Sequence, residues 1–226
     1  MKYQNIVKGR FLERPNRFIA YVEVDGRVET VHVKNTGRCR ELLTYGATVF
    51  LEKSDNKNRK TSFDLISVYK GDKLINIDSQ SPNKIFAEWV LENIPGIKLI
   101  KPEVKRGDSR FDFYIETDNE RIFVEVKGVT LEENGVAMFP DAPTDRGIKH
   151  LNGLVELIKE GYSSMIVFVI QMEDANIFMP NGETHPEFSK TLYNAENAGV
   201  KVLAIKCKVF ETEIYAFDKV KVEIKK

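Results

Sequence analysis

The hydrophobic pattern of this 226-residue chain changes once, near residue 80, and this change constrains its fold more than any other feature. Before it, short runs of alternating apolar and polar residues are typical of β-strands. After it, helical spacing alternates with strand-like runs, as expected for helices packed on a sheet. We therefore predict a two-domain α/β (α+β) chain, with a small β-barrel over residues 1–80 and a mixed sheet flanked by helices over residues 81–226.

The first 80 residues favour a closed barrel. Tyr21–Val24 and Arg27–Val33 flank Asp25-Gly26, a strong hairpin signal. Residues 38–43 fit one or two helical turns. Other strand-like runs lie before Pro15 and at residues 47–51, 61–69 and 73–78. A total of about five short strands is too few for a sandwich of seven or more and fits a small barrel.

The second domain mixes both element types. Met165–Ile170 is a continuous apolar run, which predicts a buried central strand ending near Gln171. Thr144 is the expected N-cap of the helix that follows the loop with Pro140 and Pro143. The remaining expected helices cover about 82–95, 145–160 and 187–198, and the remaining strands 111–116, 121–126, 200–206 and 210–217.

Composition excludes several classes of protein. The longest apolar run, six residues, is far shorter than the roughly 20 residues of a membrane span. The N-terminus has no apolar segment of signal-peptide length. Cys39 and Cys207 lie far apart and lack the spacing of a zinc site. We therefore expect a cytoplasmic protein without disulfides and without a membrane partner.

The charge balance conceals an asymmetry. The chain has 34 basic and 34 acidic residues, yet residues 1–80 hold 15 basic and 10 acidic ones, a balance of +5. The remainder, 19 basic and 24 acidic, is at −5. A small basic barrel is a recurrent platform for nucleic acid, because its cations displace counterions from phosphates. A solvated surface rich in lysine is the alternative, and charge alone does not decide between them.

Three charged residues stand out in the second domain. Glu125 and Lys127 alternate with apolar residues on one predicted strand, so they share a face. Asp112 opens the neighbouring strand. Two carboxylates with a backbone carbonyl between them suit Mg²⁺, or Mn²⁺, and a lysine beside the ion can stabilise charge on phosphorus. Glu88 is a further acidic candidate, whereas a plain ion pair on a solvated strand is the alternative reading.

Several strings resemble the SfsA family, named for sugar fermentation stimulation. They are Ser109–Phe113, Val124–Leu131 and Phe139–Gly147, together with Asn35–Arg38, Glu41–Leu43 and Asp78–Asn83 in the first half. The resemblance covers essentially the whole chain, and the string at 139–147 is the most distinctive.

The resemblance implies an N-terminal OB-fold and a C-terminal PD-(D/E)XK nuclease-like domain with a DNA-binding role and nuclease activity. The nuclease signature would fall on Asp112, Glu125 and Lys127, with Glu88 as the helix acid. Phe111 stands where the superfamily's name has proline. His185 is given no role.

We therefore expect a DNA-binding protein with a Mg²⁺-dependent nuclease site. A non-enzymatic DNA-binding regulator that keeps the nuclease fold is the alternative, and RNA as a substrate and a homodimer stay open. Phe18, Tyr21 and Tyr45 either stack on bases or fill the barrel. Arg146 and His150, four residues apart, share a helix face. The arginines expected to contact nucleic acid are Arg10, Arg14, Arg17, Arg38, Arg110 and Arg146.

Overall fold

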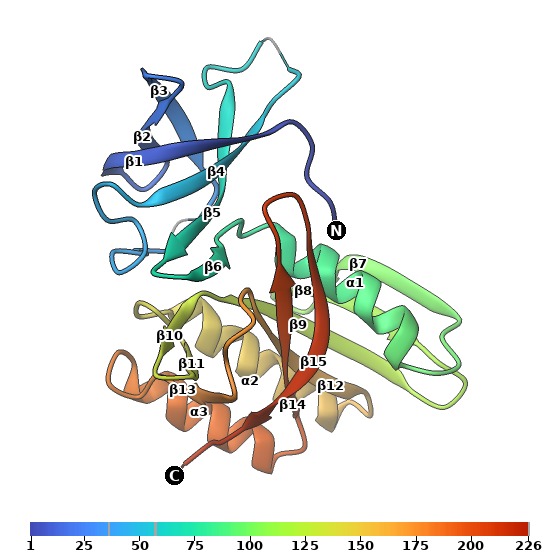
Figure 1. Cartoon of the computed structure of the whole chain (residues 1–226). Helices are drawn as coiled ribbons and strands as arrows, with labels where there is room; N and C mark the ends of the chain where they lie inside the picture. Colours follow the sequence, from blue (N-terminus) through green and yellow to red (C-terminus); the bar gives the residue numbers. More distant parts are fainter. Residues whose placement is uncertain (36, 57, 226) are drawn as a thin grey trace.

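The computed structural model describes residues 1–35, 37–56 and 58–225. Its first part is a sheet of order β3-β2-β1-β4-β5-β6, in which a parallel pairing of β3 with β5 closes five strands into a barrel (Figure 1). The predicted small barrel is confirmed. Its strands are β1 (Ile6–Asn16), β2 (Ile19–Val24), β3 (Arg27–Val33), β4 (Thr48–Lys53), β5 (Phe63–Lys70) and β6 (Lys73–Asn76).

The turn between β2 and β3 has the backbone that its sequence predicts. Asp25 and Gly26 have φ angles of 49° and 74°, and both central residues of a type I′ hairpin need positive φ. Within residues 38–43, of the one or two helical turns expected, a single turn forms, in which the amides of Leu42 and Leu43 donate to the Cys39 carbonyl at 3.2 and 2.9 Å, and no longer helix follows. Cys39 has a φ of 45°, which a right-handed helix does not accommodate.

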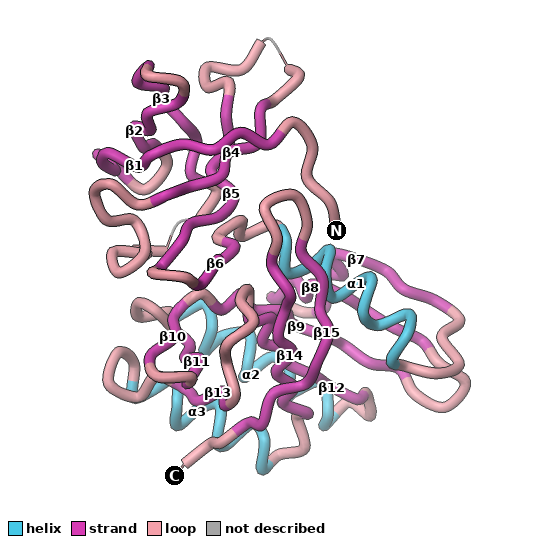
Figure 2. The backbone as a smooth tube through the Cα atoms, viewed as in Figure 1, coloured by secondary structure: helices cyan, strands magenta, loops and turns pink. Residues whose placement is uncertain are grey.

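The second part is a mixed sheet of order β10-β11-β13-β15-β14-β12-β9-β8-β7 (Figure 2). Helix α1 packs on one face with Phe113 and Val124, whereas α2 and α3 pack on the other with Phe123 and Phe168. The predicted mixed sheet with flanking helices is confirmed. Its elements are α1 (Ser81–Asn93), β7 (Leu99–Arg106), β8 (Ser109–Glu116), β9 (Arg121–Val129), β10 (Leu131–Glu133), β11 (Val136–Phe139), α2 (Asp145–Lys159), β12 (Ser163–Ile170), β13 (Ile177–Pro180), α3 (Pro186–Asn197), β14 (Lys201–Val209) and β15 (Ile214–Val222).

Strand β12 is the buried central strand that its apolar run predicts. It pairs in parallel with β9 and β14, and all of its residues after Ser163 are buried. Strand β7 escaped prediction because it is an exposed edge strand without apolar alternation. The strand expected at 210–217 begins only at Ile214, because Phe210 and Glu213 close the turn that joins β14 to β15.

A buried polar junction joins the two parts. Gln171, which follows β12, donates from Nε2 to Asn76 Oδ1 (2.8 Å), the Asp78 carbonyl (3.0 Å) and Ser81 Oγ (3.0 Å). A Cβ at Gly128 would lie 2.6 Å from Gln171 Oε1, so this position accepts only glycine without a shift. The junction therefore fixes the start of α1 against β9.

No helix within the described residues is long and apolar enough to cross a membrane.

Candidate active site

The structure brings Asp112, Glu125 and Lys127 together on β8 and β9. The two strands pair in register from Phe113 and Val124 towards the β8–β9 turn. Asp112 lies one residue beyond that register, and its Oδ2 accepts a hydrogen bond from the Val126 amide at 2.8 Å. Its carboxylate is thereby held beside the segment that carries Glu125 and Lys127.

Glu125 is buried, and its two oxygens have different surroundings. Oε1 accepts from Lys127 Nζ at 2.6 Å and contacts His150 Nδ1. Oε2 is buried and has no hydrogen-bond partner among the residues that the structure describes. Leaving a buried acceptor unpaired costs about 1–3 kcal/mol, and more when it is charged. An unpaired carboxylate oxygen in an otherwise satisfied cluster indicates a place for an external ligand.

Asp112 and Glu125 have pKa values displaced in opposite directions. Burial and the neighbouring charge of Glu125 raise the pKa of Asp112. Burial also acts to raise the pKa of Glu125, but the hydrogen bond from His150 and the charge of Lys127 outweigh it and hold this pKa below its ordinary value. Such a divergence between adjacent carboxyl groups is common in active sites, and a bound cation would favour ionisation of both.

Two further residues hold the carboxylates and were not predicted to do so. Asn83, in the first turn of α1, donates from Nδ2 to Asp112 Oδ1 at 2.9 Å. His150, buried on α2, contacts Glu125, and its Nε2 lies 3.5 Å from Arg146 Nε. Because an arginine Nε only donates, His150 accepts at Nε2 and carries its proton on Nδ1, towards Glu125. The spacing of Arg146 and His150 was the available signal, but nothing local indicated that His150 points into the sheet.

Glu88 does not reach this site. It lies on the exposed side of α1, where its Oε2 binds the Met1 amino group at 2.7 Å. Five residues along a helix correspond to a rotation of about 140°, so Glu88 and Asn83 point in different directions. Asn83 therefore replaces Glu88 as the residue that α1 contributes.

The six predicted arginines have different environments. Arg146 lies at the site, Arg10 pairs with Glu23 at 2.5 Å, and Arg110 lies 3.6 Å from Glu103. Arg17 and Arg38 are exposed on the barrel.

Arg14 is a correction to the predicted set. Its guanidinium donates to the carbonyl oxygens of Asn35 (2.6 Å), Arg17 (2.7 Å), Gly37 (2.9 Å) and Arg38 (3.0 Å). It therefore holds loops in place and has little capacity left for phosphate.

The donor set fits Mg²⁺ or Mn²⁺. Magnesium is held by one or two protein carboxylates and keeps waters and substrate oxygens as its other ligands. Asp112 and Glu125 supply two carboxylates, one with a free oxygen. The described residues contain no group of three or more His, Cys, Asp or Glu side chains placed to bind a metal.

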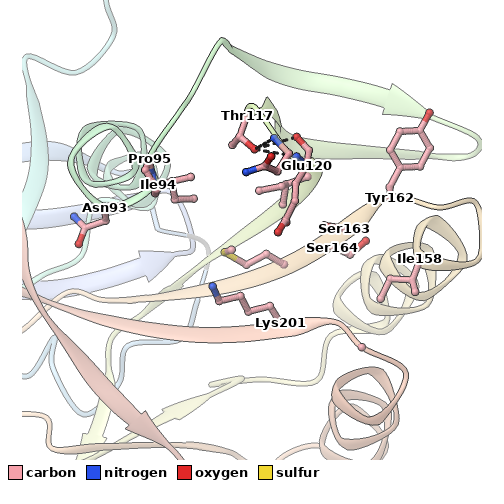
Figure 3. A pocket seen from close by; sticks show the side chains of 14 residues that line it. Asn93, Ile94, Pro95, Thr117, Glu120, Ile158, Tyr162, Ser163, Ser164 and Lys201 are labelled. Atoms are coloured by element: carbon pink, nitrogen blue, oxygen red, sulfur yellow. Dashed lines mark hydrogen bonds between the residues drawn. The ribbon is translucent and has the colours of Figure 1, made fainter.

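A separate pocket of 560 Å³ lies at the other end of these strands (Figure 3). Ile122, Ser163 and Lys201 line it, and all three are at the beginnings of their strands. Glu125 lies three residues further along β9, about 10 Å away. The pocket contains none of the predicted site residues and belongs to a different part of the sheet.

Comparison with known proteins agrees with this architecture. Residues 12–77 match the family described as SfsA N-terminal OB domain, and residues 80–213 match the sugar fermentation stimulation protein RE domain. A sugar fermentation stimulation protein homolog from Clostridium beijerinckii is 57% identical, covering 98% of this chain and 99% of its own length. A homolog from Ruminiclostridium cellulolyticum is 56% identical, covering 93% and 94%.

A solved structure has the same fold over its whole length. The structure of Pyrococcus furiosus SfsA in complex with Ca²⁺ has a TM-score of 0.90 and 31% sequence identity, covering 99% of this chain and 98% of that one. Both domains, their order and their sequences therefore agree with one family. The chain belongs to the SfsA (sugar fermentation stimulation protein) family, with an OB barrel followed by a restriction endonuclease-like domain.

Proposed function

We propose that this protein binds DNA and cleaves phosphodiester bonds with Mg²⁺ or Mn²⁺ held by Asp112 and Glu125. One observation carries the proposal: Glu125 is fixed through Oε1 by Lys127 and His150 while its buried Oε2 has no partner among the described residues. An oxygen held in this way is preorganised for a cation. A family relative of the same fold was solved with Ca²⁺, an ion that also prefers oxygen ligands.

Each residue then has a distinct task. A divalent cation at this place supplies a bound water of lowered pKa and positive charge for phosphate oxygens. Asp112 and Glu125 hold it, and the hydrogen bonds from Asn83 and His150 keep the two carboxylates in position. The Lys127 ammonium stabilises the charge that develops on the phosphoryl oxygens.

The barrel supplies affinity. Its surplus of five positive charges attracts the phosphate backbone whatever the base sequence, so we expect binding with little sequence preference and a steep dependence on salt. A protein that bound DNA in this way without cutting it would fit the alternative role of a regulator.

The test is cleavage of end-labelled single-stranded DNA, duplex DNA and RNA with Mg²⁺ or Mn²⁺, and with a chelator. We expect metal-dependent products that Glu125→Gln reduces by about 10²–10³-fold, the usual loss of a group that stabilises the transition state. Glu156→Gln is the matched control, since Glu156 is exposed on α2 and pairs with Lys159. Equal cleavage by wild type and Glu125→Gln would remove the catalytic assignment, and binding without cleavage would leave the regulator.

A further inference from the structure

A groove of 860 Å³ crosses the face of the barrel next to the second domain. Its described lining residues include four arginines and a single carboxylate, Glu13. We call it the arginine groove and define it by Arg14, Arg17, Arg38, Arg40, Tyr45 and Pro143. Arg40 was not among the residues that the sequence suggested.

The backbone of the loops that line the groove is held in place by the side chains of Arg14 and Cys39. The four hydrogen bonds of Arg14 fix the backbone carbonyls at Arg17 and Arg38. Cys39 is buried in the barrel core, so Arg38 and Arg40 on either side of it are exposed. Burial raises the pKa of the Cys39 thiol to about 12, which makes it an inert anchor. The exposed guanidinium groups are therefore presented by a fixed backbone.

The groove is connected to the candidate active site. Asp141 accepts a hydrogen bond from the Arg38 amide at 3.2 Å, and a Cβ at Gly37 would lie 2.5 Å from its carboxylate. Ala142 and Pro143 line the groove. Arg146 follows Pro143 by three residues, so their Cα atoms are at most about 11 Å apart. The segment 141–146, which also carries Asp141 and Asp145, thus connects the groove to Arg146, the residue that contacts His150.

A second depression at the domain junction has the reverse charge. It has a volume of 700 Å³ and lies between the β5–β6 hairpin and the β14–β15 hairpin, and its described lining has four carboxylates and one lysine. They are Asp72, Glu173, Asp174, Glu211 and Lys73. A polyanion is therefore attracted to the arginine groove and repelled from this depression.

Aromatic side chains indicate what form the polyanion takes. Tyr45 in the groove is 75% exposed, and Phe18, next to Arg17, is 52% exposed. Arg10 lies 5.8 Å from the centre of the Tyr45 ring and steadies it. Exposed rings beside a cationic groove stack on bases, and bases are available for stacking only where they are not already stacked in a duplex.

We propose that the arginine groove binds single-stranded nucleic acid and leads it to Glu125, so that the substrate is a single strand or a duplex with a single-stranded end. This deepens the proposed function and rests on it for the cleavage step. Binding to the groove does not depend on the metal site, so the two ideas can fail separately.

The test is fluorescence anisotropy in a chelator with a 20-residue oligothymidylate and with a hairpin duplex of equal length. We expect the oligothymidylate to bind at least tenfold more tightly. Combined Arg17→Gln, Arg38→Gln and Arg40→Gln should weaken its binding at least tenfold and lower the slope of log affinity against log salt by about 2. Tyr45→Ala should cost about tenfold on the single strand and little on the duplex.

Matched controls are Arg27→Gln, at the exposed β2–β3 turn, and Tyr215→Ala, on β15. Duplex binding as tight as that of the single strand, or equal losses of affinity in the control variants, would overturn the proposed role of the groove. All of the substituted side chains are at least partly exposed, and thermal unfolding would show whether each variant is folded. Tight groove-dependent binding without cleavage in Mg²⁺ would retain the groove and defeat only the nuclease proposal.

Discussion

Two clusters of charged side chains, one around Asp64 and one around Asp112 and Glu125, differ in how fully their carboxylate oxygens are hydrogen-bonded. Asp64 in the barrel accepts from Arg59 Nη1 at 3.0 Å and Nη2 at 2.6 Å, and its Oδ1 lies 2.9 Å from His32 Nδ1. Asp112 has only neutral donors, and Glu125 keeps one oxygen without a partner among the described residues. The Asp64 cluster is complete within the protein, whereas the Asp112–Glu125 cluster leaves room for a cation from solution.

The pKa values follow the same contrast. Burial acts to raise the pKa of Asp64, but Arg59, His32 and Lys34 outweigh it and hold this pKa below its ordinary value. Burial and the charge of Glu125 raise the pKa of Asp112. Ionised Asp64 therefore stabilises the fold, and ionised Asp112 destabilises it until a cation binds.

The largest expected effect separates activity from stability at Asp112. Asp112→Asn should reduce cleavage by about 10²–10³-fold while the free energy of unfolding stays within about 1 kcal/mol of wild type or rises. The stability is retained because the side-chain amide of Asn83 can rotate. Its oxygen then accepts a hydrogen bond from the NH2 group that the substitution introduces. Cleavage rates and urea unfolding curves measure the two quantities. A variant that is active, or one that is unfolded, would show that Asp112 acts like Asp64.

The converse change should cost stability. Asp64→Asn is expected to lower the free energy of unfolding by about 2–4 kcal/mol, because Arg59 and Lys34 lose their common counter-charge in a largely buried place. Urea unfolding checks this, with Asp72→Asn in an exposed turn as the control. A loss below about 0.5 kcal/mol, the size of an ordinary surface substitution, would mean that the Asp64 cluster is not a stabilising one.

The pH dependence should have opposite signs in the two clusters. The folded pKa of Asp64 is depressed, so its stabilisation is fully present above its unfolded value, ordinarily 3.8, and is lost as the pH falls towards the folded pKa. The folded pKa of Asp112 is raised, so its penalty appears as the pH rises through that pKa. Differences in stability between wild type and each aspartate-to-asparagine variant, measured from about pH 3 to 7, should therefore change in opposite directions. If both stability differences changed with pH in the same direction, the proposed contrast between Asp64 and Asp112 would be wrong.

The smallest effect concerns the residue that positions Glu125. His150→Ala should weaken Mn²⁺ binding about tenfold, since a residue that orients a metal ligand typically contributes this much. His150→Gln, which keeps a donor for Glu125, should recover most of the affinity. Calorimetric titration distinguishes this from a merely structural role, for which both variants would bind Mn²⁺ as wild type does.

Much of this site was predictable because its pattern is local. Glu125 and Lys127 share a face by the two-residue period of a strand, and the string around Asp112 identifies the neighbouring strand. Asn83 could not be found this way, because its contact depends on how α1 lies over the sheet. Edge strand β7 has no apolar alternation, and the carbonyls that occupy Arg14 come from loops whose course no local pattern specifies.

The proposed nuclease function requires that the Asp112–Glu125 cluster bind a divalent cation. Calorimetric titration of Mn²⁺ into wild type, Glu125→Gln and Asp64→Asn tests this without any nucleic acid. We expect saturable binding to wild type and to folded Asp64→Asn, and at least about 100-fold weaker binding to Glu125→Gln. No saturable binding to wild type, or equal binding to Glu125→Gln, would contradict the central claim.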